Sequence, residues 1–215
     1  MFVIANKQKK KKYNNNNLPI LALPKNYIIV EAKSVDVITK WITDELTNKL
    51  NWLGIDLEWK ADFNINGQNT FNSASFLQLA TPQSCLVIHI RDLKGIHIPC
   101  IESLMSNKTI LKFGIGIEMD KKKFTLLFPS CNPTSWYDLG ETAKKNGFPA
   151  PGTGPQGSLH GAFSLCNDIL HKFYQEVPEI TFTDWSKAPI DEMHVNYMAL
   201  DAWMCTEIAA LLLRK

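Results

Sequence analysis

Long apolar runs and targeting signals are missing from this sequence. No stretch approaches the ~18 apolar residues that a membrane-spanning helix needs, and the lysine-bearing N-terminus has no long apolar segment of a secretory signal. Residues 1–25 also lack arginine, which argues against a mitochondrial transit peptide. We find no internal repeat, and a length of 215 residues suits one α/β domain with a sizeable core.

Paired cysteines are absent as well. The sequence has no C-x-x-C motif, and its cysteines are odd in number and widely spaced. This pattern argues against a disulfide framework and a zinc knuckle, and it predicts an intracellular, reducing compartment. The five cysteines are Cys85, Cys100, Cys131, Cys166 and Cys205.

A strong excess of one charge is also lacking, since the formal net charge is +2. Residues 1–25 hold six lysines and no acid, so the other 17 basic residues share the rest of the chain with all 21 acidic ones. A nucleic-acid partner therefore cannot be inferred from bulk charge and has to be argued from a site.

The lysine run at 9–12 is followed by four asparagines at 14–17. Because such a composition cannot bury a core, we predict a disordered Lys/Asn-rich tail at 1–25 and one folded domain at 26–215. The functional interpretation of the tail is a nuclear address or a loose tether to polyanions, and the alternative is a solvated low-complexity leader.

Hydrophobic periodicity predicts alternating strands and helices after the tail. Three strands joined by short connections, at 53–59, 75–80 and 85–90, indicate an antiparallel start to the sheet. The whole order predicts an α/β fold, a mixed β-sheet flanked by α-helices. Further strands are expected at 27–30, 110–114 and 135–139, and helices at 35–50, 98–105, 117–128, 141–146, 159–173 and 191–213. The Pro/Gly-rich stretch 149–157 is either a mobile flap or a plain connector.

The chain is organised around residues 53–59, where an apolar run leads into two carboxylates. Asp56 and Glu58 stand two residues apart, so a strand places both on one face. Two like charges beside an apolar strand are costly to hold together, and a cation between them relieves that cost. An exposed strand edge is the alternative, which the apolar flanks and Trp59 disfavour.

Two other patterns hold acids. Tyr197 and Asp201 are four residues apart, so one helical face carries both, although a core tyrosine and a solvated acid would give the same spacing. Residues 112–120 predict a strand, a glycine turn and a helix start, where Glu118 and Asp120 compete as the acid. A dinucleotide site at this turn is excluded because the third glycine is missing.

Together these patterns resemble a known family. D-x-E on a strand, an acid after K-x-G-x-G-x-x-x-D, and Y-x-x-x-D on a late helix resemble the three motifs of the DEDD superfamily, the DnaQ-like 3′→5′ exonucleases, in its tyrosine subclass. The sequences at 112–120 and 197–203 are similar to the Werner-syndrome-type exonuclease domain. The resemblance covers residues 27–213, and Asp184-Trp185 before the last helix also fits.

The resemblance implies an RNase H-like fold and a set of site residues. The metal-binding acids would be Asp56, Glu58, Asp120 and Asp201, and Tyr197 would orient the attacking water. The histidine subclass would place His at 196, where this chain has asparagine, and the nearby His194 is out of register. Carboxylate ligands suit Mg²⁺ or Mn²⁺, and two such ions would support phosphodiester hydrolysis.

The resemblance also implies an activity. We expect removal of nucleoside 5′-monophosphates from 3′ ends of DNA, with RNA as a second substrate. RNase D-like RNA trimming is the enzymatic alternative, and a catalytically silent nucleic-acid-binding domain of the same fold is the other. We expect no membrane partner, a helicase or DNA-repair protein acting in trans, and a nuclear or otherwise cytoplasmic location.

Substrate contacts are predicted at four positions. Trp59 or Trp185 can stack on a terminal base, Lys112 can meet a phosphate, and the backbone of Leu57 can touch the terminal nucleotide. For the aromatic residues and Leu57 the alternative is the core, and for lysines on a helix it is a solvated face. The further lysine candidates are Lys121, Lys122, Lys123 and Lys187.

Overall fold

The computed structural model describes residues 18–48, 51–61, 64–65, 68–69, 71–148, 161–187 and 189–214. The predicted lysine-run tail up to residue 17 and the predicted loop at 149–157 lie outside these residues. The predictions of disorder up to residue 17, of a nuclear address and of a flap therefore stay predictions. The predicted tail boundary at residue 25 is wrong, because Leu21 is buried and its backbone N–H donates to the Phe173 carbonyl at 2.8 Å.

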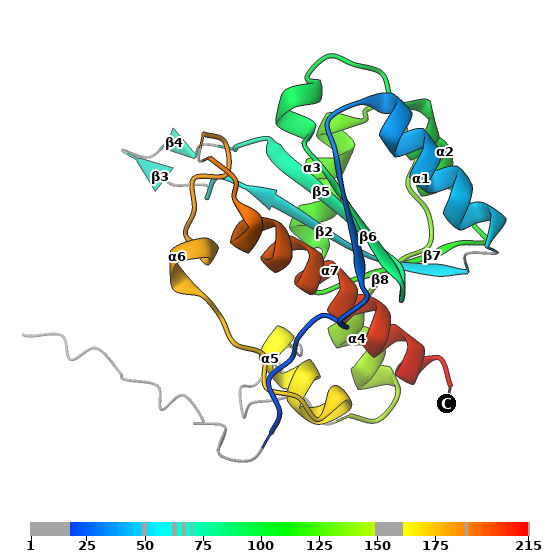
Figure 1. Cartoon of the computed structure of the whole chain (residues 1–215), viewed down its shortest axis with the longest axis vertical. Coiled ribbons are helices and arrows are strands. Elements are labelled where there is room, and N and C mark those ends of the chain that lie inside the picture. The colour runs from blue at the N-terminus through cyan, green and yellow to red at the C-terminus, as the bar shows by residue number, and fades with distance from the viewer. Residues whose placement is uncertain are drawn as a thin grey trace, which may run out of the picture.

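A six-stranded mixed sheet forms the centre of the fold, in the order β1-β6-β5-β2-β7-β8 (Figure 1). The predicted antiparallel start is confirmed, because β5 pairs antiparallel with both β2 and β6. The other pairs, β1 with β6, β2 with β7 and β7 with β8, are parallel. The strands are β1 Ile28–Ala32, β2 Trp52–Trp59, β5 Ala74–Ala80, β6 Ser84–Ile88, β7 Leu111–Gly114 and β8 Trp136–Asp138, beside a separate pair β3 Asn64–Ile65 and β4 Gln68–Asn69.

Helices cover both faces of this sheet. The long helix α7 crosses one face and contacts β1, β2, β5, β6 and β7, whereas residues of α1, α2 and α3 share the hydrophobic core on the other face (Figure 1). The predicted α/β fold with flanking helices is thereby confirmed. The helices are α1 Val35–Thr47, α2 Pro99–Ser106, α3 Glu118–Leu127, α4 Leu139–Lys145, α5 Ala162–Leu165, α6 Pro178–Thr181 and α7 Glu192–Leu212, with one 3₁₀ turn, η1 Ile90–Leu93.

The predicted helix at 159–173 is too long. After α5 the chain forms one π-helical turn, η2 Cys166–Leu170, and stops at His171, which adopts a left-handed conformation with φ 52°. A left-handed residue cannot continue a right-handed helix. Phe173 then makes a parallel bridge with Ile20, so residues 171–177 run as an extended connector rather than a helix.

The strand β2 is packed differently on its two faces. Leu53, Ile55 and Leu57 belong to the core shared with α1, α2 and α3. The alternate residue Gly54 faces α7, where an added Cβ would overlap the carbonyl oxygen of Ala202. This glycine lets the backbones of α7 and β2 approach closely, which brings the residues after it on the same face toward α7.

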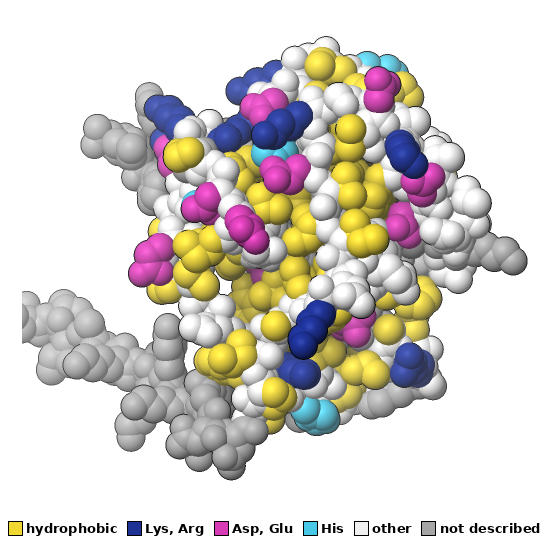
Figure 2. Space-filling model, in the orientation of Figure 1, with side chains coloured by type: hydrophobic (Ala, Val, Ile, Leu, Met, Phe, Trp, Pro, Cys, Tyr) yellow, Lys and Arg dark blue, Asp and Glu magenta, His cyan; other side chains and the backbone are white. Residues whose placement is uncertain are grey.

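Charges on the surface are mixed. On the face shown in Figure 2, Lys and Arg side chains are interspersed with Asp and Glu rather than gathered by sign. Among the described residues, no helix combines the length and apolar character needed to cross a membrane. All five cysteines are free thiols.

Candidate active site

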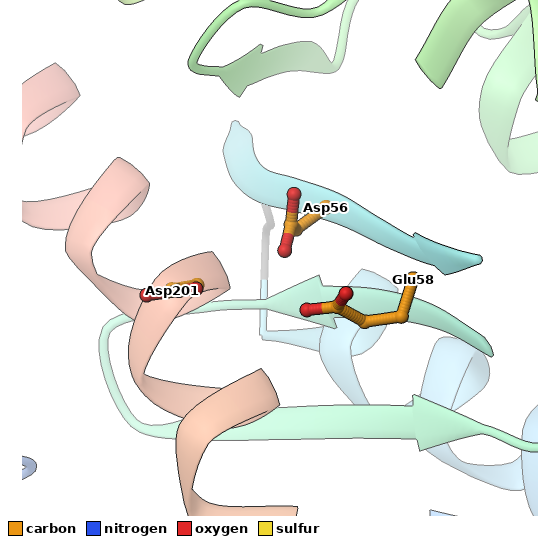
Figure 3. A group of neighbouring side chains, drawn as sticks. All are labelled: Asp56, Glu58 and Asp201. Atoms are coloured by element: carbon orange, nitrogen blue, oxygen red, sulfur yellow. The ribbon is translucent and has the colours of Figure 1, made fainter. Parts of the chain in front are cut away.

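Three of the predicted acids meet between β2 and α7. Asp56 and Glu58 follow Gly54 at two-residue intervals on β2, and Asp201 lies on α7 next to Ala202. One carboxylate oxygen from each of the three lies within 4.8 Å of the others. Figure 3 shows the carboxyl groups of Asp56 and Glu58 leaving the strand toward Asp201. The close approach at Gly54 therefore creates a half-buried group of three acids.

The fourth predicted acid, Asp120, lies in the first turn of α3, directly after a glycine turn. Gly116 in this turn has φ +68°, a conformation that favours glycine. Asp138 fixes the turn, because its Oδ2 accepts hydrogen bonds from the backbone N–H of Gly116 at 2.7 Å and of Ile117 at 3.3 Å. The side chain of Asp120 on α3 is buried, and its charge raises the pKa of Asp56 and Glu58. The competing Glu118 is exposed instead and lies 3.5 Å from Lys121.

The four carboxyl groups are held in an environment that disfavours their charges. Burial raises the pKa of Asp56 and Glu58 well above the usual range, and the neighbouring carboxylates raise both further. Burial also raises the pKa of Asp120 to about 7 and that of Asp201 to about 6. An unpaired buried charge is costly, so this arrangement is stable in ionised form only with a positive partner.

The residues fit a divalent cation. Oδ1 of Asp120 is buried without a hydrogen-bond partner among the described residues, and an orphaned acceptor of this kind is suited to a cation. The donor set is all carboxylate oxygen. Hard cations such as Mg²⁺ and Mn²⁺ prefer these ligands, whereas softer metals prefer sulfur or nitrogen. Asp56, Glu58, Asp120 and Asp201 are the residues that would hold such ions.

Tyr197 lies one helical turn before Asp201 and is packed into place. Its ring stacks on Trp185 with centroids 6.4 Å apart, and Trp185 in turn meets Phe76 edge to face at 5.8 Å. The backbone carbonyl of Trp185 accepts a hydrogen bond of 2.9 Å from Arg91. Burial raises the pKa of the Tyr197 phenol, so this hydroxyl stays protonated at neutral pH.

A second tyrosine, which the sequence motifs did not indicate, also reaches the acids. The hydroxyl of Tyr174 donates a hydrogen bond of 2.7 Å to Oδ1 of Asp201. Tyr174 is only 5% exposed. It follows a segment predicted as helix, and its contact with Asp201 depends on tertiary packing, so no local signal could have identified it.

A cleft of about 470 Å³ opens beside Glu58. One wall is the end of β2 with Leu57 and Trp59, and the other is the segment 181–185 after α6. Phe182 on the second wall is 84% exposed, an unusual state for a phenylalanine. An ion pair of 3.0 Å between Lys60 and Asp184 joins the two walls. Phe182 was not predicted, because a sequence pattern does not show which aromatic residue is left exposed.

Two of the predicted substrate contacts are wrong. Lys112 is fully buried, and its Nζ donates hydrogen bonds to the backbone carbonyls of Asn107 at 2.6 Å and Thr134 at 3.2 Å, so its ammonium is engaged away from the cleft. Trp185 lines the cleft but is 1% exposed, because its ring is enclosed by Phe76, Tyr197 and other residues. It therefore offers no ring face to a base and instead supports Tyr197.

The three lysines of α3 differ in exposure, since Lys122 is exposed and Lys121 is partly exposed. Lys123 is fully buried, where its Nζ donates to the Asn72 carbonyl at 2.7 Å and lies 4.7 Å from the ring centroid of Trp59. Trp59 itself is half-buried and lines the cleft, as does Leu57. Lys187 is exposed.

One buried amide has no partner in this site. Gln78 on β5 is opposite Asp56 in the antiparallel register, and directly opposed residues share a face of the sheet. Its side chain is fully buried, and neither Oε1 nor Nε2 makes a hydrogen bond in the described part of the chain. The site thus contains an uncompensated amide in addition to its uncompensated acids.

Comparison with known proteins assigns this chain to a family. A sequence model described as 3'-5' exonuclease matches residues 27–215. The chain therefore belongs to the 3'-5' exonuclease family, and the predicted membership is confirmed. The 3'-5' exonuclease of Drosophila willistoni is 24% identical over 178 residues, which cover 80% of this chain and 47% of that protein. The bifunctional 3'-5' exonuclease/ATP-dependent helicase WRN of Mus musculus is 26% identical over 190 residues, which cover 87% of this chain and 13% of that protein.

Solved structures share the fold. The Aedes aegypti Nibbler EXO domain matches with a TM-score of 0.70 and 20% identity, covering 91% of each chain. Escherichia coli RNase D, described as an exoribonuclease involved in structured RNA processing, matches with a TM-score of 0.67 and 18% identity, covering 88% of this chain and 44% of that one. These matches confirm the predicted RNase H-like fold. The chain spans about half, or less, of the length of the curated relatives it matches.

Proposed function

We propose that this chain is a divalent-metal-dependent 3′→5′ exonuclease that releases nucleoside 5′-monophosphates from DNA ends. The observation that carries the proposal is the meeting of Asp56, Glu58 and Asp201 within 4.8 Å beside an open cleft. Two Mg²⁺ or Mn²⁺ ions bound there would supply Lewis-acid stabilisation of the attacking and leaving oxygens of an in-line displacement.

The chain's own residues then have distinct roles. Asp56 is the most enclosed by other acids, since Glu58, Asp120 and Asp201 all act on its pKa, and it would be central to cation binding. The Tyr197 hydroxyl is neutral at pH 7 even at the ordinary pKa of a phenol, and burial raises its pKa further, so it would hold and orient a water molecule rather than remove its proton. The stacking of Tyr197 on Trp185 restrains the ring that carries this hydroxyl.

Substrate would enter through the cleft beside Glu58. The exposed ring of Phe182 faces solvent on one wall, and Trp59 lines the other, so both can stack on unpaired bases near the 3′ end. Lys60 lines the Trp59 wall, and a phosphate there would compete with Asp184 for its ammonium. A base held by stacking is recognised without regard to its identity, which suits an exonuclease acting on many sequences.

RNA is the second candidate substrate, because E. coli RNase D shares the fold. Digesting DNA and RNA oligonucleotides of one sequence in parallel separates the two possibilities. The oligonucleotides carry a 5′ label and are incubated with Mg²⁺. We expect one-nucleotide shortening from the 3′ end, faster on DNA than on RNA, and the opposite order would favour RNA trimming.

Site variants test the assignment itself. Asp56→Ala should abolish shortening, and Tyr197→Phe should slow it by about 100-fold or more, the range for loss of alignment of a reacting group. The matched control is Asp44→Ala, which removes an exposed acid paired with Lys40 on α1. Shortening that survives Asp56→Ala would overturn the proposal, and a wild type that binds oligonucleotide without cutting it would indicate a silent binding domain.

A further inference from the structure

Tyr174 is held rigidly although it lies in an extended connector. Its neighbour Phe173 donates its backbone N–H to the Pro19 carbonyl at 2.9 Å and accepts from the Leu21 N–H at 2.8 Å. The Tyr174 ring meets Phe163 edge to face with centroids 5.3 Å apart. Backbone pairing and ring packing therefore fix the position of the Tyr174 hydroxyl. Because the side chain is already held in place, its hydrogen bond costs little further conformational entropy.

The hydroxyl of Tyr174 is directed at one oxygen of Asp201. The hydrogen bond to Oδ1 is 2.7 Å long, within the short range typical of a hydroxyl donor and a carboxylate. A donor fixed on Oδ1 restricts rotation of the carboxyl group about the Cβ–Cγ bond, and this sets the direction in which the remaining lone pairs point. Interactions with Tyr174 and Tyr197 both act on the Asp201 carboxyl group.

We propose that Tyr174 is a positioning residue, which orients Asp201 for metal binding through this hydrogen bond. The residue touches neither the substrate nor the reacting water in this role, and it lies outside the three sequence motifs. Outer-sphere hydrogen bonds to metal-binding carboxylates commonly change metal affinity by about 10–100-fold. The inference rests on the proposed function, because it requires Asp201 to bind a cation.

The test measures Mn²⁺ binding directly, without nucleic acid. Free Mn²⁺ gives an electron paramagnetic resonance signal that disappears on binding, so titration gives a Kd for the wild type and for Tyr174→Phe. We expect the Kd of Tyr174→Phe to rise about 10-fold or more. In the exonuclease assay, the Mn²⁺ concentration for half-maximal rate should rise in parallel, and excess Mn²⁺ should restore much of the rate.

A matched control separates positioning from a general loss of packing. Tyr27 also donates its hydroxyl to protein oxygens, the carbonyls of Thr81 and Ser84, both at 2.8 Å. Tyr27→Phe therefore removes the same atom from a comparable environment away from the acids. We expect similar melting temperatures for both variants in EDTA, and an unchanged Mn²⁺ Kd for Tyr27→Phe alone.

The outcomes are distinguishable. A wild type that binds no Mn²⁺ overturns the proposed function. A wild type that binds Mn²⁺ with Tyr174→Phe within about twofold of it overturns the role of Tyr174 alone. Should Tyr174→Phe not fold, Phe163→Leu keeps the hydroxyl while removing its ring support, and a weaker Mn²⁺ affinity in that variant supports the inference whereas an unchanged one contradicts it.

Discussion

Neutralising Asp120 should stabilise the metal-free protein, and more so at high pH. Its folded pKa is about 7 against an ordinary value of 3.8, because the carboxyl group is buried. A folded pKa above the unfolded one means that the contribution is fully present below pH ~4 and is lost as the pH rises toward about 7. At ~1.4 kcal/mol per pH unit, the loss is on the order of 4 kcal/mol above pH ~7.

The Asp120→Asn variant removes this titration. Between pH 5 and pH 8 in EDTA, its advantage over the wild type should grow by about 2–3 kcal/mol, which corresponds to roughly 5–10 °C in melting temperature for a domain of this size. Saturating Mn²⁺ should reverse the order, because only the wild type keeps the full set of acids. The control Asp44→Asn changes an exposed acid on α1, and its difference from the wild type should stay constant.

Differential scanning fluorimetry at several pH values, with EDTA or Mn²⁺, provides both comparisons. A constant gap between Asp120→Asn and the wild type from pH 5 to 8 in EDTA would refute the reasoning. That result would mean that burial does not raise the pKa of Asp120 and that its unpartnered Oδ1 is not a cation ligand.

Three other changes test the site. Gly54→Ala should cost about 1–3 kcal/mol and lower activity, because its Cβ would push against Ala202 and displace α7; unchanged thermal unfolding would contradict this. Gln78→Leu should stabilise the metal-free protein by about 1–3 kcal/mol in chemical denaturation, since it removes a buried amide without partners, and a loss of stability would show that the amide is satisfied. Phe182→Ala should raise KM for single-stranded oligonucleotide by about 5-fold or more with little change in melting temperature, and an unchanged KM would exclude stacking on this ring.

Local periodicity was enough to predict the central geometry. The two-residue spacing of Asp56 and Glu58 placed both on one face of β2, and the α7 contact at Gly54 confirms that this face meets the helix. The order of strands and helices predicted a mixed sheet because each element has a clear apolar period. The assignment of chemistry depended on the family resemblance, since the acids alone would not name a reaction.

Side-chain environments were harder to predict than backbone elements. The sequence suggested Lys112 and Lys123 as phosphate contacts. In the structure both are fully buried, and each donates to a backbone carbonyl. Tyr174 reaches Asp201 only because His171 ends the preceding helix and the connector pairs with residues 19–21. These placements are set by long-range packing, which local patterns do not encode.

The identity of the first product is the most direct test of the central claim. A single-stranded oligonucleotide with a label in its 3′-terminal nucleotide is incubated with the wild type and Mg²⁺, and the products are separated at low conversion. Hydrolysis at the acids of β2 and α7 predicts a labelled nucleoside 5′-monophosphate as the first product, and none with Asp56→Ala. A labelled nucleoside without phosphate, a labelled longer fragment, or release that persists in Asp56→Ala would contradict the account.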